Sequence, residues 1–351
     1  MSFLTKVRNI FIRINQNIDV RLKNYNIKTK ETSNDEIIIL NTAIGSDNLG
    51  DEIILYYYSK AISDVVETDK LYNIATHNKL SDEDIERLLK SKYAIIVGTN
   101  ILSPQMELYS GWKFDNRLIK LRNVVLVGVG WWGYKKPSIY SRYVYRNILT
   151  KKIIHSVRDE QTLTMLKSIG ITNVVNTNCL TMLGLDEICK KIPTKKSDAV
   201  IFTVTGVSKK YKKDKDMIQI LRKNYRKLYF WPQGDIDLEY LESINECHNV
   251  EILERSLSAY TSFINKNKNL DYVGTRLHGG IHAMQNGKRT IIIAVDNRAI
   301  EISNNTGLPV ICDDGINEKL EKMINGEWET HINLNKKEIE KWHNSFKNAI
   351  S

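Results

Sequence analysis

The residues best suited to chemistry lie in residues 271–287, a segment that reads DYVGTRLHGGIHAMQNG. Arg276 and His278 follow its apolar start, where a strand is expected to give way to a helix. A guanidinium and an imidazole at a helix N-terminus can bind a phosphate or carboxylate and carry a proton beside it. Gly279 and Gly280 would let a ligand approach the backbone closely. The plainer alternative is a structural ion pair for Arg276 and a capping role for His278.

A second candidate segment, residues 45–52 (GSDNLGDE), follows the first apolar run of the chain. Asn48 can cap the next helix or hydrogen-bond a ligand. Asp51 can orient a hydroxyl group or act as a base. Simple capping of the helix by these two side chains is the alternative at this point.

The run GVGWWG at residues 128–133 supplies two aromatic side chains, Trp131 and Trp132. Their indoles could form a platform for a sugar ring. The run also has the GxGxxG spacing of dinucleotide-binding loops. That motif needs a helix at its third glycine and an acidic residue about 20 positions later, whereas YKKP follows here and the next acidic strand end is Asp159. A nicotinamide or flavin site is therefore not expected, and no metal-binding motif is recognised.

The elements that must position these residues alternate between short apolar runs and amphipathic helices. In the first half of the chain we expect strands at residues 36–43, 93–98, 124–129 and 153–157, with helices at 51–62, 82–91 and 160–168. After a polar stretch at residues 191–197 (KIPTKKS) the alternation restarts, with strands at 199–205, 227–231, 250–253, 270–273, 290–295 and 309–312 and helices at 216–225, 237–244, 257–265, 277–285, 299–305 and 317–324. This order is typical of parallel sheets covered on both faces.

The predicted fold class is therefore α/β, with two Rossmann-like doubly wound domains. We expect an N-terminal domain at residues 36–190, a C-terminal domain at 198–330, and a last helix within 331–351 that crosses back to the first domain. Open parallel sheets bind ligands outside the carboxyl ends of their strands, so the two domains should face each other across a cleft. Further candidates at strand ends include residues 203–206, 233–235 and 296–298.

Composition narrows the partners and the compartment. Lys and Arg outnumber Asp and Glu by 51 to 41, which favours an anionic partner. The four cysteines show no CxxC spacing, which argues against a zinc site or a disulfide framework (Cys179, Cys189, Cys247, Cys312). No apolar stretch approaches the roughly 20 residues of a membrane-spanning helix. These observations predict a cytoplasmic protein.

The N-terminal segment, residues 1–35, is basic and amphipathic. Its apolar residues recur at helical spacing between Phe3 and Ile14, while Lys6, Arg8 and Arg13 fall elsewhere around the wheel. Such a helix can lie on an anionic lipid surface, at the inner face of the membrane. An ordinary helix packed on the first domain is the alternative.

Four short motifs together resemble the polysaccharide pyruvyl transferase family. They are NLGD at residues 48–51, GVG at 128–130, SVRDE at 156–160 and TRLHG at 275–279, and they occur in the order typical of that family. The likeness spans roughly residues 36–315. Where the family usually continues Gly-x-Gly-Pro, this chain has Trp131 after Gly130, so the acceptor side departs from the pattern.

The resemblance implies a GT-B-like glycosyltransferase fold, phosphoenolpyruvate as donor and a pyruvylated glycan as product. It also implies that Arg276 and His278 are the donor-binding and catalytic pair and that Arg158 is a further basic position. On this reading His278 transfers the proton, Arg276 and Arg158 bind the donor's anionic groups, and Asp51 activates the acceptor hydroxyl. The N-terminal domain is then the acceptor side, where Asn48, Trp131 and Trp132 are expected to bind the acceptor, and the C-terminal domain is the donor side, where Gly279 and Gly280 adjoin the donor. Phosphoenolpyruvate is a co-substrate, and no cofactor, metal or nucleic acid is expected.

The expected acceptor is a glycan of the cell envelope or its lipid-linked precursor. Two other functions fit the same sequence. One is a GT-B-type glycosyltransferase that uses a nucleotide-sugar, because this architecture serves both chemistries. The other is a noncatalytic glycan-binding protein of the polysaccharide assembly machinery.

Overall fold

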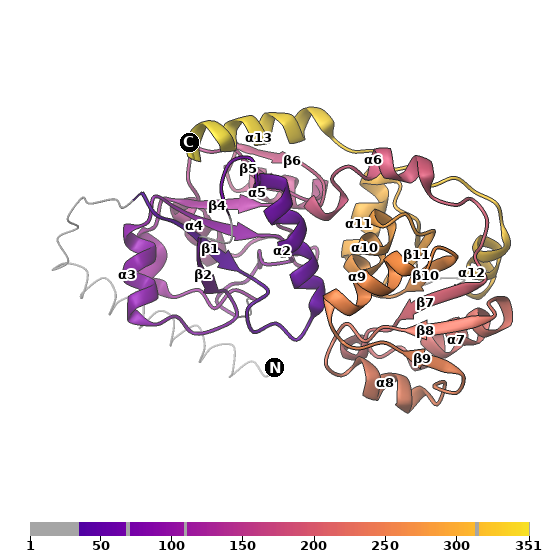
Figure 1. Cartoon of the computed structure of the whole chain (residues 1–351). Coiled ribbons are helices and arrows are strands. Elements are labelled where there is room, and N and C mark those ends of the chain that lie inside the picture. The colour runs from indigo at the N-terminus through magenta and orange to yellow at the C-terminus, as the bar shows by residue number, and fades with distance from the viewer. Residues whose placement is uncertain (1–34, 68–70, 109–110, 313–315, 351) are drawn as a thin grey trace. The chain divides into compact units, whose positions relative to one another are not determined.

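The computed structural model describes residues 35–67, 71–108, 111–312 and 316–350. The amphipathic helix expected within residues 1–20 lies outside these ranges. The chain divides into two compact units (Figure 1). Of the described residues, those within 35–45, 58–177 and 335–350 form unit 1, and those within 46–57 and 178–334 form unit 2.

Unit 1 contains a parallel sheet of four strands in the order β2-β1-β3-β4. These strands are β1 (Ile37–Asn41), β2 (Tyr72–Ala75), β3 (Tyr93–Val97) and β4 (Val124–Val127). A parallel pair, β5 (His155–Val157) and β6 (Val174–Asn176), connects to this sheet through a bridge between Val129 and Val157. Every residue of β3 and β4 is buried, as expected of strands covered on both faces.

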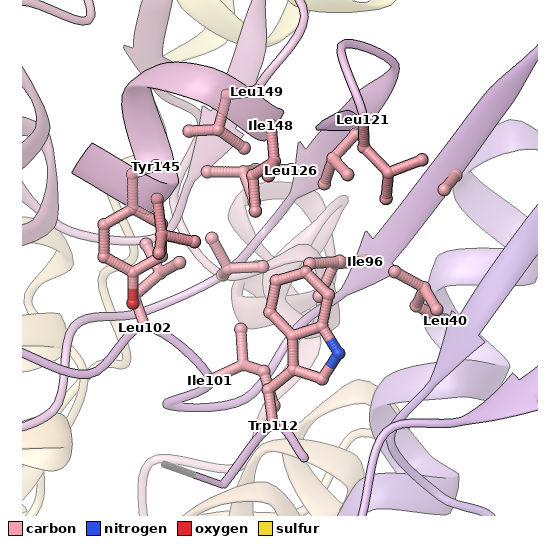
Figure 2. Packing of buried hydrophobic residues seen from close by; sticks show 14 of the residues in the cluster. Leu40, Ile96, Ile101, Leu102, Trp112, Leu121, Leu126, Tyr145, Ile148 and Leu149 are labelled. Carbon is pink, nitrogen blue, oxygen red and sulfur yellow. The ribbon is translucent and has the colours of Figure 1, made fainter. Parts of the chain in front are cut away.

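The helices of unit 1 begin where the sequence offers capping side chains. Ser81, Ser138 and Asp159 cap α3 (Asp82–Lys90), α4 (Ile139–Ile148) and α5 (Glu160–Ser168). A 3₁₀ helix, η2, covers Asn116–Lys120, and α13 (Lys336–Ile350) packs against β6. Figure 2 shows the core of this unit, where the indole of Trp112 lies among aliphatic side chains from the sheet and the loops, with Tyr145 and Ile148 contributed by α4.

Unit 2 contains a parallel sheet of six strands in the order β12-β11-β10-β7-β8-β9 (Figure 1). The strands are β7 (Ala199–Thr203), β8 (Lys227–Phe230), β9 (Val250–Ile252), β10 (Leu270–Gly274), β11 (Thr290–Ile293) and β12 (Val310–Ile311). Its helices are α6 (Leu185–Ile188), α7 (Tyr211–Asn224), α8 (Asp237–Ile244), α9 (Leu257–Lys266), α10 (Leu277–Gln285), α11 (Asn297–Thr306) and α12 (Ile316–Asn325), with 3₁₀ turns η3 (Leu180–Met182), η4 (Cys189–Lys191) and η5 (Gly206–Ser208).

Alternate residues of each strand in unit 2 point to opposite faces of the sheet. Val200 and Phe202 pack with side chains of α7, α8 and α12. Ile201, between them, packs with side chains of α9, α10 and α11. The sheet is therefore covered on both faces, which is the doubly wound arrangement predicted from the sequence.

The α/β fold class with two Rossmann-like domains is confirmed, but the units do not follow the predicted boundaries. The chain passes from unit 1 to unit 2 at Thr177–Asn178, ahead of the polar stretch at residues 191–197. The reason is that Met182, Leu185 and Cys189 pack in the core of unit 2. The facing of the two domains across a cleft stays a prediction.

The helix α2 (Leu49–Ile62) is divided between the two units, because residues 46–57 belong to unit 2. Leu49, Ile53 and Tyr57 recur four residues apart and join the core of unit 2. The loop that carries Asn48 and Asp51 is thus part of unit 2, whereas the sequence analysis assigned it to the first domain. Among the described residues, no helix has the length and apolar character needed to cross a bilayer.

Candidate functional site

The N-terminus of α10 carries the two residues that the sequence analysis ranked first. Arg276 is the N-cap residue, directly after β10, and His278 lies in the first turn. The Arg276 side chain makes no capping hydrogen bond to the helix. First-turn N–H groups have no acceptor within their own helix, so this end of α10 is suited to binding an anion.

Arg276 is held in a buried ion pair with Asp237. Its Nε donates to Oδ2 of Asp237 at 3.0 Å, and its Nη2 donates to Oδ1 of the same carboxylate. Nε also donates to the carbonyl of Val204 at 3.3 Å. The structural ion pair that was the plainer alternative for Arg276 is therefore present, and it uses two of the three guanidinium nitrogens. Among the described residues Nη1 has no hydrogen-bond acceptor, so its two N–H groups and the second N–H of Nη2 remain for a ligand.

Asp237 is hydrogen-bonded to the segments that follow three neighbouring strands, β7, β8 and β10. Its carboxylate accepts hydrogen bonds from the backbone N–H groups of Gly206 at 2.9 Å, Gln233 at 3.2 Å and Gly234 at 2.7 Å, in addition to those from Arg276. These donors follow β7 and β8, and Arg276 follows β10. The fully buried carboxylate thus fixes the loops at the carboxyl edge of the sheet.

His278 is buried and contacts a cysteine. Its Nε2 lies 3.8 Å from Sγ of Cys179, which in turn lies 3.1 Å from Oγ1 of Thr181. Cys179 follows β6 and is itself buried. The Nε2 side of the imidazole therefore faces the Cys179 thiol, which in turn contacts the Thr181 hydroxyl.

Gly279 and Gly280 have packing reasons for lacking a side chain. A Cβ on Gly279 would lie 2.7 Å from Oε1 of Gln233, and a Cβ on Gly280 would lie 2.8 Å from side-chain atoms of Tyr272 and Ile292. Protein side chains therefore occupy the space beside these two glycines in which a ligand was expected. Close packing of α10 on the sheet explains both glycines.

The loop of Asn48 is bound to the segment after β8. Oδ1 of Asn48 accepts a hydrogen bond from Nε2 of Gln233 at 2.7 Å, and the N–H of Leu49 donates to the Gln233 carbonyl at 3.0 Å. A Cβ on Gly50 would lie 2.8 Å from the same Nε2. Oε1 of Gln233 is buried and has no hydrogen-bond partner among the described residues. Gln233 therefore lies between Asn48 and Gly279.

Asp51 lies in the first turn of α2. Its Oδ2 accepts a hydrogen bond from Oγ of Ser46 at 2.6 Å. Burial lowers the pKa of Arg298, but Asp296 and then Asp51 raise it by more. Asp51 is thus close enough to interact with the cation that follows β11, so unit 2 brings Asn48, Asp51, Arg276 and His278 to the carboxyl edge of one sheet.

Arg158 belongs to unit 1, where it follows β5. Its Nη2 donates to Oδ1 of Asn100, and its Nε donates to Oδ2 of Asp159 at 3.3 Å. Its Nη1 is buried and has no hydrogen-bond partner among the described residues. A Cβ on Gly130 would lie 2.4 Å from the guanidinium carbon, so Gly130 leaves the space that this side chain fills.

The prediction that Trp131 and Trp132 form a platform for a sugar is wrong for Trp131. Its side chain is 1% exposed, its Nε1 donates to the carbonyl of Lys135 and its ring packs near Tyr145 in the core of unit 1. Trp132 is 46% exposed, and its role in binding the acceptor stays a prediction. The next helix begins at Ile139, well after the third glycine of the GxGxxG run.

A family model for polysaccharide pyruvyl transferase matches residues 48–297. The chain belongs to the polysaccharide pyruvyl transferase family. The match extends over most of the chain and includes every site residue predicted above, from Asn48 to Gly280. Membership places the protein among transferases that act on polysaccharide.

Solved structures resemble the chain at low identity. They include the wall teichoic acid polymerase TagF (13% identity, TM-score 0.43, covering 99% of this chain and 90% of that one). Two others are a putative UDP-N-acetylglucosamine 2-epimerase from Listeria monocytogenes (10%, 0.45, 88% and 90%) and UDP-N-acetylglucosamine 2-epimerase from Rickettsia bellii (11%, 0.45, 89% and 93%). These TM-scores are too low to support an argument about this protein. No curated protein matches the sequence.

Three residues that contact the predicted site residues were not predicted from the sequence. They are Asp237, Cys179 and Asn100. Asp237 was expected only as the first residue of a helix. The acidic residues in the segment after β8 could have indicated a partner for Arg276, because a buried arginine needs an anionic group beside it. Cys179 follows β6, a strand too short to be predicted, so no pattern linked it to His278.

His282 lies one turn after His278 on α10, and both of its ring nitrogens are hydrogen-bonded. The hydroxyl of Tyr57 lies 3.0 Å from Nδ1, and Oγ1 of Thr261 lies 2.9 Å from Nε2. Thr261 donates its own proton to the carbonyl of Leu257, so it accepts from Nε2 and the ring is neutral with Nδ1 as acceptor. Burial lowers the pKa of His282 to about 4.

We expect His282 to make the fold less stable in mild acid. The unfolded chain binds a proton at this residue below its ordinary pKa of 6.5, whereas the folded protein resists protonation until about pH 4. The free energy of unfolding therefore falls as pH drops through this window, by up to about 3 kcal/mol for this group. Urea unfolding at pH 7 and pH 5 should show a weaker pH dependence for His282→Asn than for the native chain.

His331 is the matched control, because its side chain is exposed. His331→Asn should keep the native pH dependence. An unchanged pH dependence in His282→Asn would show that His282 is not the titrating group.

Proposed function

We propose that this protein transfers pyruvate from phosphoenolpyruvate to two hydroxyl groups of a sugar, forming a ketal on a bacterial surface polysaccharide or its lipid-linked precursor. The observation that carries the proposal is the N-terminus of α10 in a member of this family, where His278 is buried beside Arg276. Phosphoenolpyruvate has a phosphate and a carboxylate to be bound and an enol carbon to be protonated. A helix N-terminus with an arginine and a histidine matches these needs.

The proposed reaction begins with proton transfer from the imidazolium of His278 to the methylene carbon of the donor. A sugar hydroxyl then attacks the adjacent cationic carbon and loses its proton to a base, for which Asp51 is the candidate. The bond from this carbon to the phosphate oxygen breaks and phosphate leaves. A second hydroxyl attacks the same carbon, and its proton is taken up by phosphate or solvent, which closes the ketal.

The ion pair with Asp237 changes what Arg276 can contribute. Because Nε and Nη2 bind Asp237 along one edge of the guanidinium, a donor anion would meet the remaining N–H groups of Nη1 and Nη2 together with the first-turn N–H groups of α10. The carboxylate also cancels much of the positive charge. In the proposal, Arg276 chiefly orients the helix N-terminus, and the helix supplies much of the attraction for the anion. The donor-binding role of Arg158 and the acceptor-binding role of Trp132 stay predictions.

Cys179 provides a local test of donor binding. If phosphoenolpyruvate binds beside His278, it should slow alkylation of Cys179 by a small thiol reagent by at least about 10-fold, by excluding the reagent and suppressing local opening. At about 100-fold above its Kd it should also raise Tm by roughly 5 °C. Mass spectrometry of the labelled peptides, with Cys179→Ala to assign the signal, measures the first effect.

Cys312 is exposed and serves as the internal control, since its labelling rate should not change. Protection by a nucleoside diphosphate instead of phosphoenolpyruvate would favour the nucleotide-sugar glycosyltransferase. Protection by neither would remove the support for a donor site beside His278. Stabilisation by phosphoenolpyruvate without protection of Cys179 would place the donor elsewhere.

A further inference from the structure

An exposed patch of apolar and basic side chains lies beside the carboxyl edge of the sheet in unit 2. Its apolar members are Val207, Tyr211 and Ile236, whose exposed fractions are 74%, 49% and 37%. Lys209 and Lys212 are exposed among them. Apolar side chains of this size that remain in solvent together commonly mark an interaction site.

The turn η5 and helices α7 and α8 hold this patch in place. A Cβ on Gly206 would lie 2.9 Å from Cγ1 of Ile236, so the η5 turn lies directly against the start of α8. The ring of Tyr211 packs edge-on against Tyr240 at 5.2 Å, and the N–H of Lys210 donates to the Tyr240 hydroxyl. These contacts hold in place the backbone that carries the exposed side chains.

The charge of the patch is positive. Residues 207–216 (VSKKYKKDKD) contain five lysines and two aspartates. Asp214 is buried and accepts a hydrogen bond from Tyr240, so it does not face solvent beside the lysines. Among the described residues, no acidic side chain forms an ion pair with Lys209, Lys212 or Lys215. Glu239 and Glu242 are exposed acids on the neighbouring helix α8, while Asp235 is paired with Arg255.

We propose that this patch docks on an anionic lipid bilayer. Lysines that flank exposed aliphatic and aromatic side chains fit the bilayer interface, where headgroups carry negative charge and the outer acyl region accepts apolar tips. A soluble anion would gain nothing from Val207, whose side chain projects into solvent. This surface is separate from the amphipathic segment at residues 1–35 and does not depend on it.

The location of the patch agrees with the proposed function. Residues 206–211 follow β7 and Ile236 follows β8, so the patch lies at the sheet edge that also carries Arg276 and His278. Docking there would bring the edge that binds the donor close to the membrane, where a lipid-linked acceptor is held. This link rests on the proposed function, but the docking itself can be tested without any activity.

The first test measures binding of the full chain to vesicles of phosphatidylglycerol and phosphatidylcholine by cosedimentation. Each lysine near an anionic surface strengthens binding roughly fivefold, so Lys209→Gln with Lys212→Gln should weaken it by roughly 30-fold. Lys266→Gln with Lys268→Gln is the matched control, because these exposed lysines lie before β10, at the opposite edge of the same sheet. An equal loss in both double variants, or no loss in the first, would overturn the proposal.

The second test reports the position of the patch directly and is independent of residues 1–35. A solvent-sensitive fluorophore on Val207→Cys, in a chain carrying Cys312→Ser, should shift to the blue when anionic vesicles are added. The same label on Lys266→Cys should not shift. Absence of a shift at position 207, whether or not the protein pellets with the vesicles, would show that this surface does not enter the interface.

Discussion

Replacing Asp237 by Asn is expected to lower the free energy of unfolding by about 3–5 kcal/mol, because it leaves the buried Arg276 cation without its counter-charge. The loss includes more than the ion pair. The carboxylate also accepts three backbone N–H groups, and an amide cannot accept at both of its polar atoms. Chemical unfolding monitored by circular dichroism measures the effect.

Asp235→Asn is the matched control for this prediction. Asp235 lies two residues earlier and also pairs with an arginine, Arg255, but the two side chains are 50% and 33% exposed. Exposed pairs contribute about 0–1 kcal/mol, so this variant should remain close to native stability. Equal losses in the two variants would mean that burial of the Asp237 pair is not what stabilises the edge of the sheet.

The double variant Asp237→Asn with Arg276→Gln distinguishes the charge of Arg276 from the helix N-terminus as the group that binds the donor. Removing both charges relieves the unpaired cation, so much of the stability lost in Asp237→Asn should return. The first-turn N–H groups of α10 would remain. A donor anion that depends mainly on the helix N-terminus should then still bind, more weakly, whereas one that depends on Arg276 should not.

Local patterns predicted most elements of the fold. Helices α5, α8 and α10 begin and end at the predicted residues, because apolar residues recur at helical spacing along each of them and Asp159 caps α5. The strand β2 was missed, since two of its four residues are exposed and it lacks a buried apolar run. Such an edge strand is defined by its pairing with β1, which no local pattern records.

The candidate site was predictable in position but not in its contacts. Strand ends located Arg276 and His278 correctly, because the alternation of elements fixes which loops share an edge. The partner of Arg276 is 39 residues away in the chain, and several acids could have filled that role. For Trp131 the predicted exposure was wrong. A tryptophan in a loop is expected to be exposed when the core residues around it are not known.

Replacing His278 by Asn is expected to lower turnover on the order of 100-fold or more while leaving Tm nearly unchanged. An amide cannot protonate the donor, but it fits the first turn of a helix and retains a polar atom beside Cys179. The rate of phosphate release from phosphoenolpyruvate in the presence of a glycan acceptor measures turnover.

His282→Asn is the control that separates catalysis from structure, because His282 is buried on the same helix one turn later. Its two ring nitrogens are engaged by Tyr57 and Thr261, so an amide should cost stability and leave the folded enzyme with nearly its native rate. If His278→Asn instead lost stability and kept its rate, His278 would be a structural residue like His282. The proton donor would then have to be sought among other groups at this edge of the sheet, and the proposed role of α10 would reduce to binding the anion.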